Sequence, residues 1–108
     1  MIECIFCKII KKELPSEIVY EDEKVLAFKD IKPKAPIHFL IVPKIHIESI
    51  KSERSEEVVK DLIKAAKKIA SQRNIQGYKL VFNVGKEGGQ IIEHLHLHFL
   101  AGKSIKLP

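Results

Sequence analysis

Residues 94–100 read HLHLHFL, so that three histidines alternate with apolar residues. Side chains along a β-strand point alternately to its two faces, and we therefore expect His94, His96 and His98 on one face, with the apolar residues between them in the core. A rise of about 3.3 Å per residue places the first and last of these histidines roughly 13 Å apart, too far for all three to share one metal ion. The segment predicts a strand that carries a row of imidazoles.

This clustering of histidines favours a chemical role. The chain holds only 5 histidines, and three of them fall within five residues. The alternatives are a polar face without function, or a metal clip in which two histidines at i and i+2 bind one ion. A neutral imidazole beside a phosphate can attack it once a neighbouring group fixes the tautomer. His96 is the best placed for this role, because it can be held from both sides.

The loop that precedes this segment is rich in glycine. Gly85, Gly88 and Gly89 allow backbone amides to turn toward an anion, while Asn83 and Gln90 add neutral donors. Glycine loops are more often simple hairpin turns, and only the position beside the histidines favours a phosphate-binding loop.

The rest of the chain predicts an α+β fold. One long helix is expected over residues 52–73, because apolar positions recur there at spacings of three and four and glutamates open the segment. A short N-terminal helix over 6–12 should end before Pro15. Strand-like runs cover residues 18–20, 25–29, 38–42, 78–84 and 92–100. We expect about five strands, mostly antiparallel, with the long helix packed on one face of the sheet.

The length and charge of the chain limit its class. Residues 1–108 are expected to form one domain, because single cores usually need about 100 to 150 residues. The net charge of +5 favours anionic partners. Nucleic acid is disfavoured, because no aromatic residues alternate with the helix lysines. The two cysteines, the lack of a secretory signal and the lack of an apolar run of ~18 residues predict a cytoplasmic protein without a membrane partner.

The two cysteines have the spacing of metal ligands. Cys4 and Cys7 can take adjacent tetrahedral positions, and His46 and His94 are available to complete a Cys2His2 zinc site. In that case His94 is held by the metal, while the other two histidines of the strand are left for chemistry. The alternatives are two thiols packed as small hydrophobes, or a redox dithiol, which is disfavoured because no strand precedes Cys4.

Taken together, these motifs resemble the histidine triad family, on the branch of small nucleotide-binding phosphoramidases often called Hint-type proteins. The resemblance covers nearly the whole chain and is carried by residues 4–10, 25–31, 35–44, 83–85, 88–90 and 94–100. It implies a homodimer whose sheets join across a two-fold axis. Each subunit would bind a purine nucleoside monophosphate such as AMP and cleave a bond to its α-phosphate.

The resemblance also implies roles for His38, His94, His96 and His98. His96 would attack phosphorus and form a nucleotidyl-histidine intermediate, which water then resolves. His98 would hydrogen-bond the phosphate, while His38 and His94 would orient and polarise the nucleophile. Phosphoramidates and acyl- or sulfo-linked adenylates are the substrate class that this chemistry fits.

The substrate-binding positions follow from the same resemblance. Developing negative charge would be bound by Asn83, Gln90 and the backbone near Gly89. The base would lie between Ile5, Phe6, Phe28 and Ile31, and Asp30 would accept hydrogen bonds from the ribose hydroxyls. Phe and Ile in a small domain are usually core residues, which is the competing interpretation of these positions.

Two departures from the family pattern leave other functions open. Ile91 stands where many members carry a serine on the leaving-group side, and the tail 103–108 lacks the tryptophan of better-known relatives. The alternatives are a nucleotide sensor or partner-binding module without catalysis, a dinucleoside polyphosphate hydrolase, a hydrolase with catalytic zinc, and an RNA-binding protein.

Overall fold

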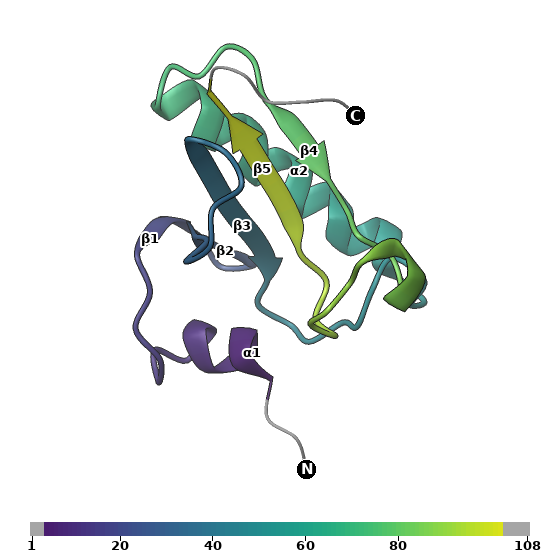
Figure 1. The fold of residues 1–108 in the computed structure, drawn as a ribbon. Helices are drawn as coiled ribbons and strands as arrows, with labels where there is room; N and C mark the ends of the chain where they lie inside the picture. The colour runs from purple at the N-terminus through teal and green to yellow at the C-terminus, as the bar shows by residue number, and fades with distance from the viewer. Residues whose placement is uncertain (1–3, 103–108) are drawn as a thin grey trace.

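The computed structural model describes residues 4–102, which form one five-stranded sheet with a helix on each face (Figure 1). The elements in chain order are α1 (Ile5–Ile10), β1 (Ile18–Glu21), β2 (Val25–Lys29), β3 (Ile37–Pro43), α2 (Ser55–Gln72), β4 (Lys79–Val81), the 3-10 helix η1 (Lys86–Gly88) and β5 (Leu97–Ala101). The strand order is β1-β2-β3-β5-β4, and every neighbouring pair is antiparallel. The predicted α+β architecture is confirmed, including the hairpin of β1 and β2.

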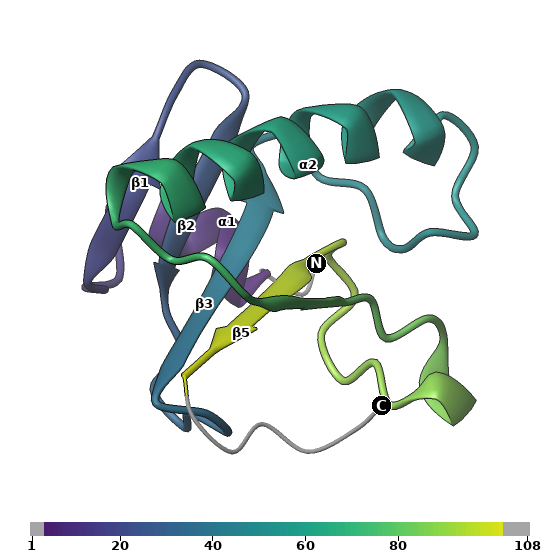
Figure 2. The ribbon, with the colours of Figure 1, turned by 90° about the horizontal axis from the view of Figure 1, so that it is seen from above.

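The central strands are buried on both faces, and they separate two apolar clusters. Along β3, Phe39 and Ile41 join the cluster beneath α2, whereas Leu40 and Val42 join a second cluster with Phe6 of α1. Figure 2 shows α2 lying along one face of the sheet and α1 on the other. The alternation of strand side chains thus gives each helix its own core.

Helix α2 follows the predicted apolar pattern, with a later start. Its turns bury Leu62, Ala66 and Ile69 against the sheet. Before Ser55 the chain forms turns instead, and the Ser55 hydroxyl donates a 2.7 Å hydrogen bond to the Ile50 carbonyl. No helix among residues 4–102 is long and apolar enough to cross a membrane.

The strand expected over 92–100 was too long in the prediction. β5 begins only at Leu97, where it pairs with Ile41 of β3. Residues 92–94 form a bend, and the Leu95 N–H donates to the Ile47 carbonyl at 2.6 Å, outside the sheet ladder. The expected alternation nevertheless persists, because Leu95 and Leu97 both enter the core beneath α2. The strand expected over 78–84 is likewise shorter, because only Lys79–Val81 pairs with β5.

Candidate functional site

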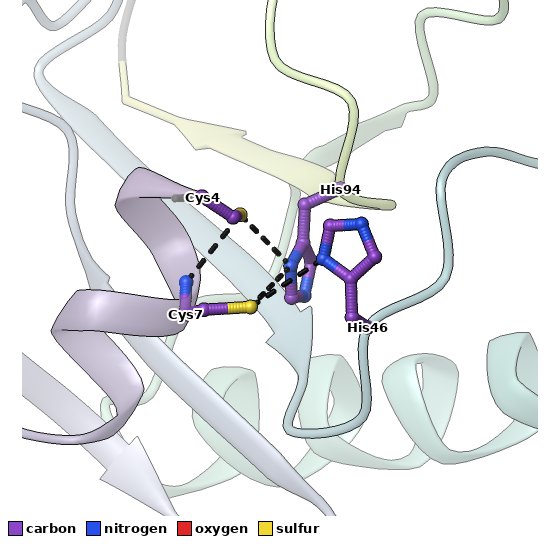
Figure 3. A group of neighbouring side chains, drawn as sticks. All are labelled: Cys4, Cys7, His46 and His94. Carbon is purple, nitrogen blue, oxygen red and sulfur yellow. Dashed lines mark hydrogen bonds between the residues drawn. The ribbon is translucent and has the colours of Figure 1, made fainter. Parts of the chain in front are cut away.

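Four potential metal ligands from three parts of the chain meet at one side of the sheet (Figure 3). α1 and the residue before it supply Cys7 and Cys4, the segment after β3 supplies His46, and the bend before β5 supplies His94. The Nδ1 atom of His94 lies 3.3 Å from Cys4 Sγ and 3.7 Å from Cys7 Sγ. His46 Nδ1 lies 3.4 Å from Cys7 Sγ. The structure therefore brings together all four residues of the predicted Cys2His2 set.

The spacing of these atoms fits a tetrahedral zinc ion. Zn–S and Zn–N bonds of about 2.3 and 2.05 Å at tetrahedral angles separate sulfur from nitrogen by about 3.6 Å, close to the distances in the cluster. The other ring nitrogen of His94, Nε2, lies 2.9 Å from the Pro43 carbonyl oxygen and must donate to it. His94 Nδ1 therefore keeps its lone pair, directed at the thiols, in the arrangement typical of a metal-bound histidine.

The backbone of His94 also holds the ring of His96. Its Nδ1 lies 2.7 Å from the His94 carbonyl oxygen, which can only accept, so the proton of a neutral His96 sits on Nδ1. Nε2 then carries the lone pair and has no partner among residues 4–102. Every buried side-chain nitrogen or oxygen in that range has a partner, so this Nε2 reaches solvent although the residue is only 9% exposed. The edge of Phe6 packs against the ring, with centroids 5.2 Å apart.

His98 lies next to His96 and pairs with His38. The ring centroids of His96 and His98 are 5.1 Å apart, and His98 Nδ1 lies 2.9 Å from His38 Nε2. Asp30 Oδ2 approaches the same His38 Nε2 at 3.4 Å. The expected contact of His38 with the nucleophile is therefore not made directly, because its ring reaches His98 instead. The ring of His94 likewise faces the thiols, and only its backbone carbonyl contacts His96.

Burial favours the neutral form of four imidazoles, those of His38, His94, His96 and His98. It lowers the pKa of His98 to about 4, with smaller effects from His96 and His38. It also lowers the pKa of His94 to about 4. For His38 burial again lowers the pKa, against a weaker opposing effect of the Asp30 carboxylate. For His96 burial also lowers the pKa, opposed first by the hydrogen bond to the His94 carbonyl and then by Asp30.

The amide side chains expected to bind an anion are engaged with the glycine loop itself. Gln90 Oε1 accepts a 3.0 Å hydrogen bond from the Gly85 N–H, and its Nε2 donates to the Glu48 and Ile92 carbonyls at 2.7 and 3.0 Å. Asn83 Nδ2 donates to the Gly88 carbonyl at 3.0 Å. Gly85 and Gly89 have φ values of 70° and 90°, which glycine adopts without strain. In this arrangement both side chains shape the loop.

The expected base-binding residues divide between core and surface. Phe6 and Phe28 are each 3% exposed and pack edge to face at 5.6 Å in the cluster beneath α1. Ile5 is half exposed, and Ile31 is 91% exposed. Asp30 lies at the end of β2, where its Oδ1 accepts a 2.8 Å hydrogen bond from the Lys32 N–H.

Sequence reasoning missed the backbone groups that complete the site. The Pro43 carbonyl, the His94 carbonyl and the Lys34 N–H each bind one imidazole nitrogen. Residue identity carries no signal for such groups, since every residue has a carbonyl and all but proline an N–H.

Known proteins resemble this chain over nearly its whole length. The family model described as "Scavenger mRNA decapping enzyme C-term binding" matches residues 3–106. The Escherichia coli K12 protein named purine nucleoside phosphoramidase is 45% identical over 107 residues, which cover 95% of this chain and 90% of that protein. The "14 kDa zinc-binding protein" of Zea mays is 47% identical over 109 residues, covering 96% and 85%.

Solved structures agree with the sequence relatives. The crystal structure of a HIT family hydrolase from Legionella pneumophila Philadelphia 1 superposes with a TM-score of 0.90 at 44% identity and covers 98% of each chain. A chain with this fold, this histidine pattern and identities of this size over nearly its whole length belongs to the histidine triad (HIT) family.

Proposed function

We propose that this chain is a purine nucleoside phosphoramidase, a hydrolase that cleaves the bond between an amine and the α-phosphate of a purine nucleoside monophosphate. The observation that carries the proposal is the hydrogen bond from His96 Nδ1 to the His94 carbonyl, which leaves the Nε2 lone pair open to solvent. The Escherichia coli relative supports the substrate class, because its name states this activity at 45% identity.

The chemistry takes two displacements at phosphorus. In the first, His96 Nε2 attacks and forms a bond to phosphorus, the bond from phosphorus to the amine breaks, and the leaving amine takes up a proton from solvent. In the second, water attacks the phosphorus and loses a proton to solvent, the bond from phosphorus to His96 Nε2 breaks, and the nucleoside monophosphate leaves, which restores neutral His96. Positive charge develops on the His96 ring in the first step, and the His94 carbonyl stabilises it by accepting from Nδ1–H. His98 has its ring 5.1 Å from that of His96 and would bind the phosphate.

Zinc is the metal that the Cys2His2 cluster fits, and Cys4, Cys7, His46 and His94 would hold it. The bound ion would supply a structural cross-link between α1 and the segments after β3 and before β5. The donor set and its distances support this, and so does the name of the maize relative. Because the carbonyl of His94 holds the nucleophile, anything that fixes His94 also fixes His96.

The nucleoside pocket and the dimer complete the proposal. Exposed Ile31 and half-exposed Ile5 would contact the base above the buried Phe6 and Phe28, and Asp30 would bind the ribose. Gly89 and the loop shaped by Asn83 and Gln90 would face the leaving group.

The proposed homodimer would form at β4, the short strand at one edge of the sheet, where a second copy would extend the sheet across a two-fold axis. Sedimentation equilibrium tests this homodimer against the 12.3 kDa mass of one chain.

The covalent step is tested with His96→Ala and an adenosine phosphoramidate. The variant removes the attacking nitrogen, so turnover should fall by several orders of magnitude while AMP still binds, measured by calorimetry. Mass spectrometry of the quenched wild-type reaction should find one adenylyl group on His96. Turnover that survives in the variant would refute the covalent mechanism. Reversible occupancy without an adduct or turnover would instead indicate a nucleotide sensor.

A further inference from the structure

The loop between β2 and β3 directs one backbone N–H at the histidine pair. The nitrogen of Lys34 lies 3.0 Å from His38 Nδ1. The loop is fixed at its start, where Asp30 Oδ1 accepts from the Lys32 N–H at 2.8 Å. At the far end of the loop Pro36 packs against Gly102, so closely that a Cβ atom added to Gly102 would lie 2.8 Å from the proline ring. The N–H of Lys34 is thus delivered by a loop held at both ends.

The Lys34 N–H fixes where the protons of two imidazoles lie, and the Asp30 carboxylate, 3.4 Å from His38 Nε2, favours the same arrangement. A backbone N–H can only donate, so His38 Nδ1 must accept and the proton of neutral His38 sits on Nε2. Nε2–H then donates to His98 Nδ1 at 2.9 Å, which places the proton of His98 on its own Nε2. That Nε2 has no partner among the described residues and reaches solvent beside His96.

We propose that the peptide N–H of Lys34 is a positioning group that sets the tautomers of His38 and His98, so that His98 offers the substrate phosphate a hydrogen-bond donor. The inference rests on the proposed function, because it assumes that a phosphate binds beside His96. In the opposite tautomer, Nδ1–H of His98 would donate to His38, and His98 would turn a lone pair toward the anionic oxygens. A contact that attracts the phosphate would then repel it.

The same N–H argues against a metal ion between Asp30, His38 and His98, whose ligand atoms lie close enough to hold one. A metal on His38 Nε2 would move the proton of that ring to Nδ1, where the Lys34 N–H already points. Two donors would then face each other at 3.0 Å, and a buried donor without an acceptor is costly. The pair of His38 and His98 is therefore arranged to share a proton between His38 Nε2 and His98 Nδ1 and not to bind a metal ion.

The direct test is the protonation of the ring nitrogens in the wild-type protein. Long-range proton–nitrogen NMR correlations separate protonated from unprotonated imidazole nitrogens, and single His38→Gln and His98→Gln variants assign the signals. At pH 7.5 both rings should be Nε2–H tautomers. A His98 ring protonated on Nδ1 would overturn the proposal, whatever the activity of the protein.

A variant then tests the cause. Lys34→Pro removes the N–H, whereas Lys34→Ala keeps it and removes only the side-chain charge. We expect Lys34→Pro to populate Nδ1–H at His38 and His98, and Lys34→Ala to keep the wild-type tautomers. Phosphoramidate kcat should fall about 10- to 100-fold in Lys34→Pro, below the 10²–10³-fold typical of the complete loss of one such donor. Wild-type tautomers in a folded Lys34→Pro would refute the role of this N–H, and if the variant does not fold, the wild-type spectrum decides.

The two proposals fail in distinguishable ways. Nε2–H tautomers in a protein that forms no adduct on His96 would leave the hydrogen-bond chain intact and remove the phosphoramidase assignment. An adduct on His96 in a protein whose His98 is protonated on Nδ1 would keep the assignment and remove the role of Lys34.

Discussion

The histidines of the site are chemically alike, and each is differentiated by the partner of one ring nitrogen. His94 donates to the Pro43 carbonyl, and His96 donates to the carbonyl of His94. The alternation in 94–100 was enough to predict which residues share a face. It could not predict the partners, because Pro43 lies 51 residues away in sequence, and the contact to the His94 carbonyl depends on a bend where a strand was expected.

A pH dependence of stability follows from the burial of His98. Its pKa of about 4 lies below the ordinary value of 6.5, so between these values the unfolded chain binds more protons than the folded one. The free energy of unfolding should therefore fall as the pH drops from 7 to 5, by about 2 kcal/mol for this one group. Urea unfolding at both pH values measures the difference. It should shrink in His98→Gln, and an equal pH difference in the variant would contradict the assignment to His98.

At the scale of elements, the long helix and the hairpin were predictable because apolar spacing and turn residues are local signals. The short strands were less so. β5 begins where its ladder with β3 begins, at the pair of Leu97 with Ile41, and that position depends on the path of β3. The position of the glycine loop was predictable from the sequence. The hydrogen bonds of Gln90 with Gly85 and Glu48 were not, because Glu48 is 42 residues away from Gln90 in sequence.

α1 has six residues, too few to be stable alone, and the cysteine–histidine cluster ties it to the rest of the fold. Protein expressed with zinc should carry one ion per chain by native mass spectrometry. A strong chelator should lower the free energy of unfolding by about 3 kcal/mol, the linkage expected when free metal is near 100 times its Kd. Cys7→Ser should bind little zinc and respond little to the chelator. Zinc-free wild-type protein with unchanged stability would contradict the proposed metal site.

On the scale of the whole molecule, the sheet separates two apolar cores, one beneath α2 and one beneath α1, which have different roles. The cluster beneath α2 contains Leu62, which is fully buried, and it lies on the face away from the histidines. The cluster beneath α1 contains Leu40, which stands opposite His98 in the pairing of β3 with β5. Phe6 of that second cluster also contacts His96. The arrangement predicts that stability depends on both cores, whereas the geometry of the catalytic histidines depends mainly on the second.

Leu62→Ala and Leu40→Ala form a matched pair that tests this division. Each removes the same atoms from a buried site, so each should lower the free energy of unfolding by about 2–5 kcal/mol, measured in urea. In conditions where both variants remain folded, Leu62→Ala should form the adenylyl adduct on His96 at close to the wild-type rate. Leu40→Ala should be at least about tenfold slower, because a cavity beside His98 lets the rings shift, and small misplacements of reacting groups are costly. Equal rates in the two folded variants would mean that the sheet alone, and not the core beneath α1, holds the histidines in register.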